Sequence, residues 1–328
     1  MIRTDKHGRG RLGRALLILG AVAVLSGCGS RLASSGGARA AEKEYTRGQL
    51  MVVAATERNR YQNIYTSRLW EVRAEDGGET FEDQLKGQME QFLVELAVMN
   101  AMAQDQGVEL TSQEKDSIKA LSSEYYDSLS EGDRAYMGAS EAEIEDLYSQ
   151  YYLADKLVTE LTSAENLEVS DAEAKVIQVQ RIRLSDRETA DQVLEEVQGE
   201  RADFGAIAAK YSEDSQTEAT LEWSDDLNAV DQAAFALEQD EISQVTEYEG
   251  SFYIQKCTNA YDEEATAARK TLLAQEKKTR AFLSIYEPYA REHPVKLKEG
   301  VWEQIGFEGG EDCTSDGFFQ MYHSYFSK

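Results

Sequence analysis

Signals for the start of a helix recur along the first half of this 328-residue sequence. Thr111, Ser140 and Ser170 are each followed three residues later by Glu. In such a capping box the hydroxyl accepts a hydrogen bond from a backbone N–H of the first turn, and the Glu side chain accepts one from the capping residue. Apolar residues recur at steps of three and four before Gly107, a residue type that often ends helices. Residues 42–170 are therefore predicted to be all-helical.

The hydrophobic pattern changes in the next segment, residues 171–259. Residues 176–184 and 251–257 are β-like runs, and two short helices are expected between them. The first of these helices is expected to begin at a fourth capping box, formed by Ser185 and Glu188. Helices that lie between two strands in this order are typical of an α+β domain.

The C-terminal region has two parts. Residues 260–307 begin with helical spacing, which Pro288 and Pro294 are expected to end because proline lacks the N–H that a helix interior needs. Residues 308–328 open with several Gly and Asp residues and are expected to be a loose tail. With 41% hydrophobic residues, the chain can bury more than one core, and its length suits about two domains.

Residues 1–27 have the arrangement of an export signal. Basic residues precede an apolar run over residues 15–25, which is shorter than the ~20 residues that a membrane-spanning helix needs. Leu25 to Cys28 resembles a bacterial lipobox, which implies cleavage before Cys28 and attachment of a lipid to its thiol. Residues 28–41, rich in Ser, Gly, Ala and Arg, are expected to be a flexible tether. The mature protein is thus expected outside the cytoplasm, held by lipid to a bacterial membrane.

The net charge excludes one class of partner. The chain has 61 Asp and Glu against 34 Lys and Arg, a formal charge of -27, and cleavage before Cys28 would remove five basic residues and one acidic residue, leaving -31. Nucleic-acid binding needs a basic face, so it is not expected. The three histidines are far apart and no CxxC pair occurs, so neither a metal nor another cofactor is expected. The sequence leaves open whether Cys257 and Cys313 form a disulfide.

A series of characteristic residues runs through residues 203–250. Its members combine apolar, aromatic, small and acidic types at fixed intervals: Asp203, Phe204, Ile207, Ala208, Tyr211, Ser212, Asp214, Leu221, Trp223, Phe235, Leu237, Glu241, Ile242, Ser243 and Gly250. In order and spacing the series resembles the parvulin, or PpiC-type, domain of peptidyl-prolyl isomerases. Together with the lipobox and the flanking helical segments, it makes the whole chain similar to the extracytoplasmic foldases of the PrsA and SurA type.

The resemblance implies an α+β fold. A helical chaperone module would be built from residues 42–170 and 260–307, and a parvulin-like domain of residues 171–259 would be inserted between them as a four-stranded antiparallel sheet flanked by helices. The implied activity is peptidyl-prolyl cis–trans isomerisation. Rotation about an X–Pro amide has a barrier of ~18–20 kcal/mol. Its catalysis needs no cofactor, only an apolar socket for the proline ring and polar groups that favour the twisted amide.

Part of the family's site can be carried over to this sequence. The family's acidic or thiol position matches Asp214, which is the candidate catalytic residue. Its apolar pocket positions match Leu221 and fall near Leu227 and Val230. Because the family usually has larger residues there, Val230 would make a shallower socket.

Other positions of the family's site are altered. The histidine of the first strand falls on Arg181, and that of the last strand falls on Phe252 or Tyr253, depending on one residue of gap; all three are candidate substrate-binding residues. The hydroxyl position near the end falls on Glu247. Without the histidines, Arg181 is expected either to form an ion pair with Asp214 or to lie as a plain charge on the strand surface. Isomerase activity is therefore expected to be weak or absent.

These features favour a membrane-anchored foldase whose partners are unfolded or partly folded exported polypeptides. A non-enzymatic holdase with the same architecture is the alternative. A solute-binding lipoprotein is a remote alternative, since such proteins alternate strands and helices in two lobes and residues 42–165 offer no strand series. The Met and Tyr residues of the helical region fit a core or, alternatively, a groove for unfolded chains. The sequence does not decide whether the chain forms a homodimer.

Overall fold

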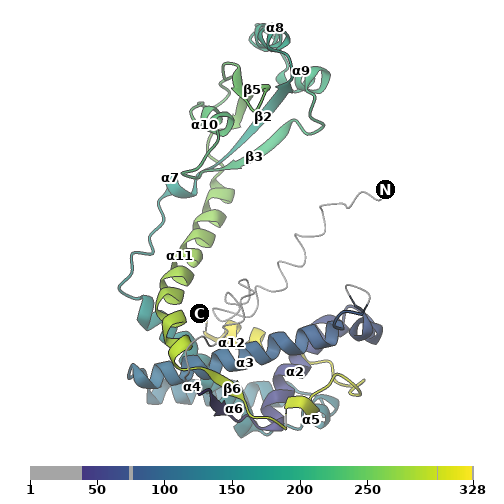
Figure 1. Ribbon diagram of the computed structural model, residues 1–328, viewed down its shortest axis with the longest axis vertical. Helices are drawn as coiled ribbons and strands as arrows, with labels where there is room; N and C mark the ends of the chain where they lie inside the picture. Colours follow the sequence, from purple (N-terminus) through teal and green to yellow (C-terminus); the bar gives the residue numbers. More distant parts are fainter. Residues whose placement is uncertain (1–38, 74–76, 301, 327–328) are drawn as a thin grey trace. The chain divides into compact units, whose positions relative to one another are not determined.

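The computed structural model describes residues 39–73, 77–300 and 302–326 (Figure 1). The chain divides into two compact units: Met1–Ala164 with Thr279–Lys328 is unit 1, and Glu165–Lys278 is unit 2. Unit 1 is mainly helical and unit 2 contains a four-stranded antiparallel sheet, so the predicted α+β class with an inserted sheet domain is confirmed. The predicted signal peptide, Cys28 and most of the tether lie outside the described residues.

Helices make up most of the N-terminal part of unit 1. They are α2 (Arg47–Gln62), η4 (Ser67–Glu71), α3 (Phe81–Asp105), α4 (Ser112–Ser128), α5 (Glu131–Met137) and α6 (Glu141–Thr162). Capping boxes start α4 and α6 as predicted. Those of α2, α3 and α5 use Gln or Asp in place of Glu, so the Ser/Thr–Glu pattern did not detect them. Within the described ranges, no helix is both long and apolar enough to cross a membrane.

The Met and aromatic residues of these helices are mostly core residues. Each of the following is less than a tenth exposed: Trp70, Met89, Phe92, Met99, Met102, Tyr125, Tyr148 and Tyr151. Tyr65 is different, with 58% of its surface exposed. For the buried residues the core interpretation holds, and a surface groove built from them does not exist in this structure.

The end of the chain completes the core of unit 1. After η5 (Trp302–Gln304), helix α12 (Phe318–Phe326) buries Phe318, Phe319 and Tyr322. The ring of Phe318 stacks on that of Tyr148 with centroids 4.1 Å apart, and the Tyr148 hydroxyl donates to the Phe318 carbonyl at 2.9 Å. The structure differs here from the predicted loose tail, because the aromatic residues after the Gly- and Asp-rich stretch fill the space between helices.

Buried polar groups hold the segment before α12 in place. Arg58 is 2% exposed and donates to the carbonyl of Gly309 at 2.7 Å. The carboxylate of Asp133 accepts from the backbone N–H of Thr314 at 2.8 Å. Cys313 is buried between these contacts, and it and Cys257 are both free thiols. The segment is therefore fixed by hydrogen bonds to α2 and α5, without a disulfide.

Two further elements were not predicted as they stand. The strands β1 (Ala41–Lys43) and β6 (Val295–Leu297) pair in parallel, although their few residues give no periodicity. Helix α11 (Glu263–Glu292) continues through Pro288 and ends shortly before Pro294. The prediction that Pro288 helps to end the helix is wrong. Only the second proline coincides with the helix end, since the residue before a proline disfavours helical geometry.

Unit 2 is organised around an antiparallel sheet with strand order β3-β2-β5-β4 (Figure 1). The strands are β2 (Val176–Leu184), β3 (Glu218–Glu222), β4 (Thr246–Tyr248) and β5 (Ser251–Asn259). The shorter helices of this unit are α7 (Asp171–Ala174), α8 (Arg187–Val197), α9 (Phe204–Tyr211) and α10 (Ala229–Phe235). β2 matches the predicted strand, and β5 extends the second one by two residues. β3 and β4 are too short for sequence periodicity to reveal.

Different helices cover the two faces of this sheet. On one face, Ile182 and Leu184 of β2 pack against residues of α8 and α9; we call it the α8–α9 face. On the other, Ile177 and Val179 pack against Ala234 of α10; we call it the α10 face. This alternation along β2 follows from the strand geometry, which points successive side chains to opposite sides.

The start of α8 lies one residue later than predicted. Its N-cap is Asp186, whose side chain accepts from the backbone N–H of Thr189 at 2.7 Å. Ser185 instead donates to the carboxylate of Glu213 at 2.6 Å. The fourth capping box is therefore wrong: the serine of the pattern is used to hold a loop, and the neighbouring aspartate caps the helix.

Candidate functional site

Strand β2 presents two arginines on the α10 face. Arg181 and Arg183 flank Ile182, which packs on the α8–α9 face, so the arginine side chains lie on the opposite side. Arg181 Nη2 lies 2.6 Å from Asp231 Oδ1, and Arg183 Nε lies 2.7 Å from Asp214 Oδ1. The predicted pairing of Arg181 with Asp214 is therefore wrong. The two arginines bind different aspartates.

The loop that carries Asp214 is fastened to β2 at Arg183. Ser212 Oγ accepts from the backbone N–H of Arg183 at 3.2 Å and from that of Asp214 at 3.3 Å. The backbone N–H of Glu213 donates to the Arg183 carbonyl at 2.9 Å. Hydrogen bonds from Ser185 lower the pKa of Glu213 below its usual value. These contacts bring the carboxylate of Asp214 to Arg183.

Asp214 is an ion-paired and partly exposed carboxylate. Its side chain is 43% exposed, and the hydrogen bond that it accepts raises the pKa of Arg183. A second carboxylate, that of Glu213, lies 3.6 Å from Arg183 Nη1. Hydrogen bonds between ionised partners are among the stronger ones in proteins, so this contact occupies one oxygen of Asp214. That oxygen is not free to orient a substrate amide.

Arg181 joins three elements of the domain. Besides its ion pair with Asp231 of α10, its Nε donates to Gln255 Oε1 of β5 at 2.9 Å. Gln255 is fully buried, and its Nε2 donates to the carbonyl of Val230 at 2.7 Å. Arg181 is thus not a plain charge on the strand surface. It is bound into a polar network between β2, β5 and α10.

The strand register distinguishes the two candidates on β5. Phe252 lies opposite Leu184 and packs on the α8–α9 face, whereas Tyr253 lies opposite Arg183. Residues directly opposite each other in an antiparallel pair share a face. Of the two positions that the sequence left open for the second histidine, Tyr253 is therefore the one beside Arg183 on the α10 face.

The strand register also bears on Glu247, the residue at the candidate hydroxyl position. Glu247 lies opposite Phe252, so it belongs to the α8–α9 face, while Thr246 lies opposite Tyr253. The hydroxyl of Thr246 therefore lies on the same face as Arg183, the residue that binds Asp214. Thr246 was not predicted as a site residue, because the face on which it lies depends on the register of β4 with β5.

The apolar candidates lie at one end of the α10 face. Leu221 of β3 is opposite Ile177 and packs with the cluster of Ile177, Val179 and Ala234. Val230, on the first turn of α10, is 2% exposed. Leu227 precedes α10 and is half-buried, and its carbonyl accepts from the side chain of Gln232. The structure thus places Leu221 in the apolar cluster of the α10 face, whereas neither Val230 nor Leu227 belongs to that cluster.

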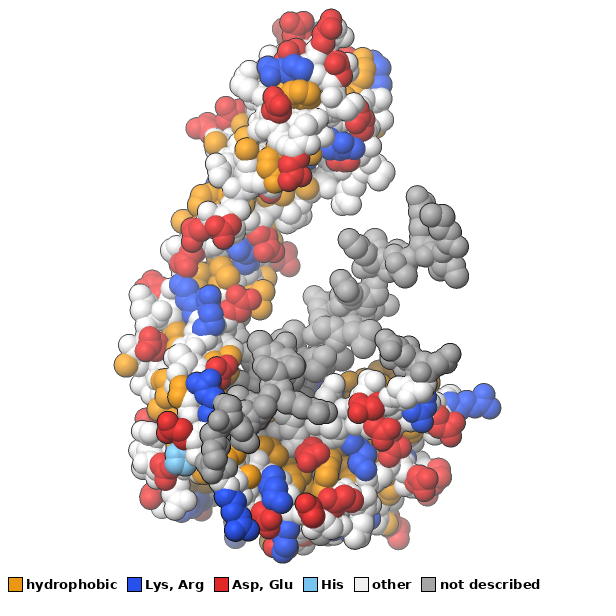
Figure 2. All heavy atoms as spheres, in the orientation of Figure 1, with side chains coloured by type: hydrophobic (Ala, Val, Ile, Leu, Met, Phe, Trp, Pro, Cys, Tyr) orange, Lys and Arg blue, Asp and Glu red, His pale blue; other side chains and the backbone are white. Residues whose placement is uncertain are grey.

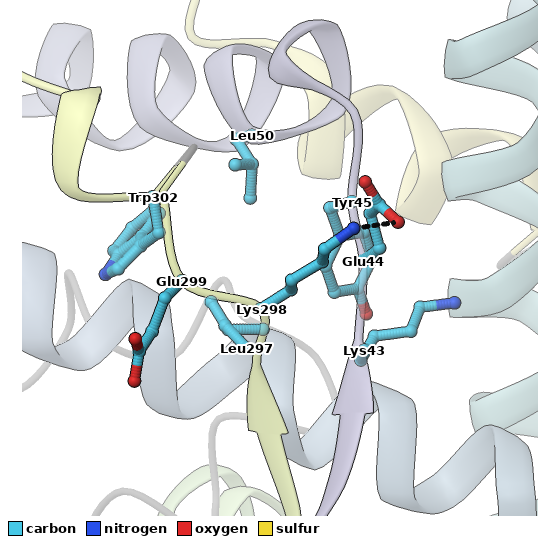
Figure 3. A pocket seen from close by; sticks show the side chains of 8 residues that line it. All are labelled: Lys43, Glu44, Tyr45, Leu50, Leu297, Lys298, Glu299 and Trp302. Carbon is cyan, nitrogen blue, oxygen red and sulfur yellow. Dashed lines mark hydrogen bonds and ion pairs between the residues drawn. The ribbon is translucent and has the colours of Figure 1, made fainter.

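Unit 1 contains a separate cavity of about 130 Å³ (Figure 3). Tyr45, Leu50, Leu297 and Trp302 supply its apolar lining, and Lys298 Nζ donates to Glu44 Oε2 at 2.9 Å across the rim. A cavity of this size suits one apolar side chain, since small-molecule sites are typically ~300–1,000 Å³.

Comparison with known proteins assigns unit 2. The family model of the Rotamase, PPIC-type PPIASE domain, matches residues 178–259. These residues are a PPIC-type domain. The match covers α8, α9, α10 and all four strands, except for the first two residues of β2. It also contains the series of residues from 203 to 250. The resemblance drawn from that series is confirmed.

The relationship extends beyond the PPIC-type domain. The foldase protein PrsA of Streptococcus sanguinis is 23% identical over 256 residues, covering 69% of this chain and 75% of that protein. Among solved structures, PrsA of Bacillus cereus is 18% identical with a TM-score of 0.34, covering 78% of this chain and 99% of that one. PrsA of Streptococcus pneumoniae is 22% identical with a TM-score of 0.26, covering 72% and 98%. A 256-residue alignment is longer than unit 2, so homology to PrsA reaches into unit 1.

Proposed function

We propose that this protein is an extracytoplasmic foldase that assists the folding of exported polypeptides. The observation that carries the proposal is the PPIC-type domain inserted between the two segments of a helical unit, in a chain whose homology to PrsA foldases exceeds that domain. Unit 1 would hold unfolded or partly folded clients, with the cavity at Tyr45 and Trp302 receiving one apolar side chain. Unit 2 would bind prolyl segments on its α10 face.

The anchor and location form a second part of the proposal. The basic and apolar run before Cys28 supports export, and the lipobox resemblance supports lipidation of its thiol. Acidic side chains are spread over the surface drawn in Figure 2, which suits a soluble body next to a membrane. Labelling of cells with a fatty-acid analogue should mark the wild-type protein and not Cys28→Ser. Equal labelling of both would contradict the anchor.

Isomerisation on this site would be slow. On the α10 face the half-buried Leu221 would supply an apolar contact for a proline ring, and the buried Val230 would support the first turn of α10 beside it. The twisted amide needs polar groups aimed at it during rotation. The resemblance implies that Arg181 and Tyr253 stand at the two histidine positions of the family, and Asp214 is bound by Arg183. The site would therefore bind prolyl segments better than it accelerates their rotation.

A non-enzymatic holdase is the second candidate, favoured by the ion pair between Arg183 and Asp214. A soluble chain of residues 29–328 distinguishes the two in paired assays of prolyl-peptide isomerisation and of client aggregation. Turnover that falls in Asp214→Ala supports the foldase. The control is Asp191→Ala, which removes an exposed, arginine-paired carboxylate of α8. Suppression of aggregation without turnover supports the holdase, and absence of both contradicts either function.

A further inference from the structure

A partly buried set of polar side chains, which we call the brace, ties α10 to the centre of the unit 2 sheet. Its two side chains are Arg181 of β2 and Gln255 of β5, which lie opposite each other in the sheet and are joined by the bond from Arg181 Nε to Gln255 Oε1. Gln255 then donates to the carbonyl of Val230, and Arg181 donates to the carboxylate of Asp231. Two successive residues of α10 are thus each held by one member of the brace.

The supports of the brace are fixed on both sides. Ser243 Oγ accepts from the backbone N–H of Gln255 at 2.9 Å, and the Ser243 N–H donates to the Gln255 carbonyl at 2.8 Å. On α10, Asn228 caps the helix, and its Nδ2 donates to Asp231 Oδ2 at 2.9 Å. Asp231 therefore uses one carboxylate oxygen for the helix cap and the other for Arg181. Both ends of the brace are therefore fixed by further hydrogen bonds.

A helix as short as α10 needs such support. It spans seven residues, Ala229–Phe235, and isolated helices shorter than ~12 residues are marginal in water. Its apolar contacts with the sheet centre on a small cluster around Ala234. The position of Val230 over the sheet consequently depends on the hydrogen bonds at the first turn.

We infer that Arg181 and Gln255 are positioning residues that hold the first turn of α10, with the buried Val230, in place beside the prolyl site. The inference rests on the proposed binding of prolyl segments by the α10 face. The resemblance implies a histidine at the position of Arg181, but Arg181 acts on the site through α10 and not through the substrate amide. Its planar guanidinium directs Nε toward β5 and Nη2 toward α10 at once, a geometry that lysine cannot reproduce.

The test combines peptide binding with backbone hydrogen exchange on the chain of residues 29–328. The probe is a tetrapeptide with a central leucyl-proline bond. Arg181→Met should weaken binding of this peptide about tenfold, a change typical of removing one buried hydrogen-bonding partner. Amides of α10 should exchange at least about tenfold faster, while those of α8 and α9 keep their protection. Arg187→Met, which removes an exposed ion pair with Asp191, is the matched control and should change neither quantity.

A double-mutant cycle separates positioning from general destabilisation. If Arg181 acts by holding the first turn of α10 through Val230, Arg181→Met should cost little further affinity in a Val230→Ala background, because the packing that fixes this turn is already lost. Additive losses in the double variant would overturn the inference. Gln255→Glu keeps the shape of the side chain and its bond to Arg181, but it replaces the N–H donor to the Val230 carbonyl with an oxygen. If Arg181→Met does not fold, the same two measurements are made on Gln255→Glu.

The outcomes also distinguish this inference from the proposed function. A wild-type chain that binds no prolyl peptide contradicts the proposed function and the inference with it. A wild-type chain that binds the peptide, together with an Arg181→Met variant whose α10 amides remain protected, overturns the inference alone.

Discussion

Arg183 and Asp214 form a 2.7 Å ion pair across the edge of the α10 face, between the central strand β2 and the loop that follows α9. Residue 214 is the candidate catalytic position, so the chemistry of the domain depends on what this pair does. Both partners are partly exposed, at 29% and 43%. Such surface pairs contribute only ~0–1 kcal/mol to stability. The pair therefore restricts Asp214 without being needed for the fold.

Removing the arginine should release the carboxylate. We expect Arg183→Met to raise kcat/KM for prolyl-peptide isomerisation about tenfold, because Asp214 becomes free to orient toward the substrate amide. The free energy of unfolding should change by less than about 1 kcal/mol. A protease-free isomerisation assay and urea denaturation check the two expectations. Unchanged or lower turnover would mean that the ion pair does not limit the site.

Glu95 should make the stability of unit 1 depend on pH. This residue lies half-buried on α3, and burial raises its pKa from 4.5 to about 7. Since the folded protein then binds the proton more tightly than the unfolded chain, the stability that protonation supplies is complete below pH 4.5 and is lost as the pH rises toward 7.

A neutral side chain at position 95 should remove this dependence. At pH 8 we expect Glu95→Gln to be more stable than wild type by roughly 1–3 kcal/mol, and at pH 4.5 the two should be nearly equal. Urea denaturation followed by the fluorescence of Trp70 and Trp302, both in unit 1, measures the difference. A difference that is the same at both pH values would contradict the burial of an ionisable carboxyl at this site.

The C-terminal helix should be needed for the stability of unit 1. Phe318 is fully buried and stacks on Tyr148. Its replacement by alanine should lower the free energy of unfolding by about 3–5 kcal/mol, the usual cost of deleting a buried aromatic ring. Gln320→Ala, on the exposed side of the same helix, is the control and should change stability little. Equal stability of the two variants would instead support the prediction from the sequence that residues 308–328 form a loose tail.

Local patterns of the sequence predicted much of the fold. Capping boxes at Thr111, Ser140 and Ser170 start helices because a side chain and the backbone three residues away interact without outside help. The run of residues 176–184 was long enough, and rich enough in apolar and β-branched residues, to predict β2. By contrast, β4 and β6 have three residues each and exist only because a partner strand lies beside them. Tertiary pairing of this kind leaves no periodic signal in the sequence.

Some residues of the candidate site could likewise be predicted from the sequence, and others could not. The order of residues located Asp214 and Leu221 within a PPIC-type domain, which needed only spacing along the chain. Which arginine meets Asp214 depended on the loop contacts of Ser212, and the choice between Phe252 and Tyr253 depended on the register of β5. A shift of one residue turns a side chain to the other face of a sheet, so an alignment with one uncertain gap cannot decide such positions.

NMR of the chain of residues 29–328, titrated with a proline-containing peptide, tests most directly whether the α10 face binds prolyl segments. The methyl resonances of Leu221 and Val230 should shift on titration, while those of Val193 and Leu194 on α8 stay in place. The same peptide with alanine in place of proline should shift none of them. Binding that moves the α8 resonances instead, or that does not distinguish proline from alanine, would contradict a prolyl socket on the α10 face.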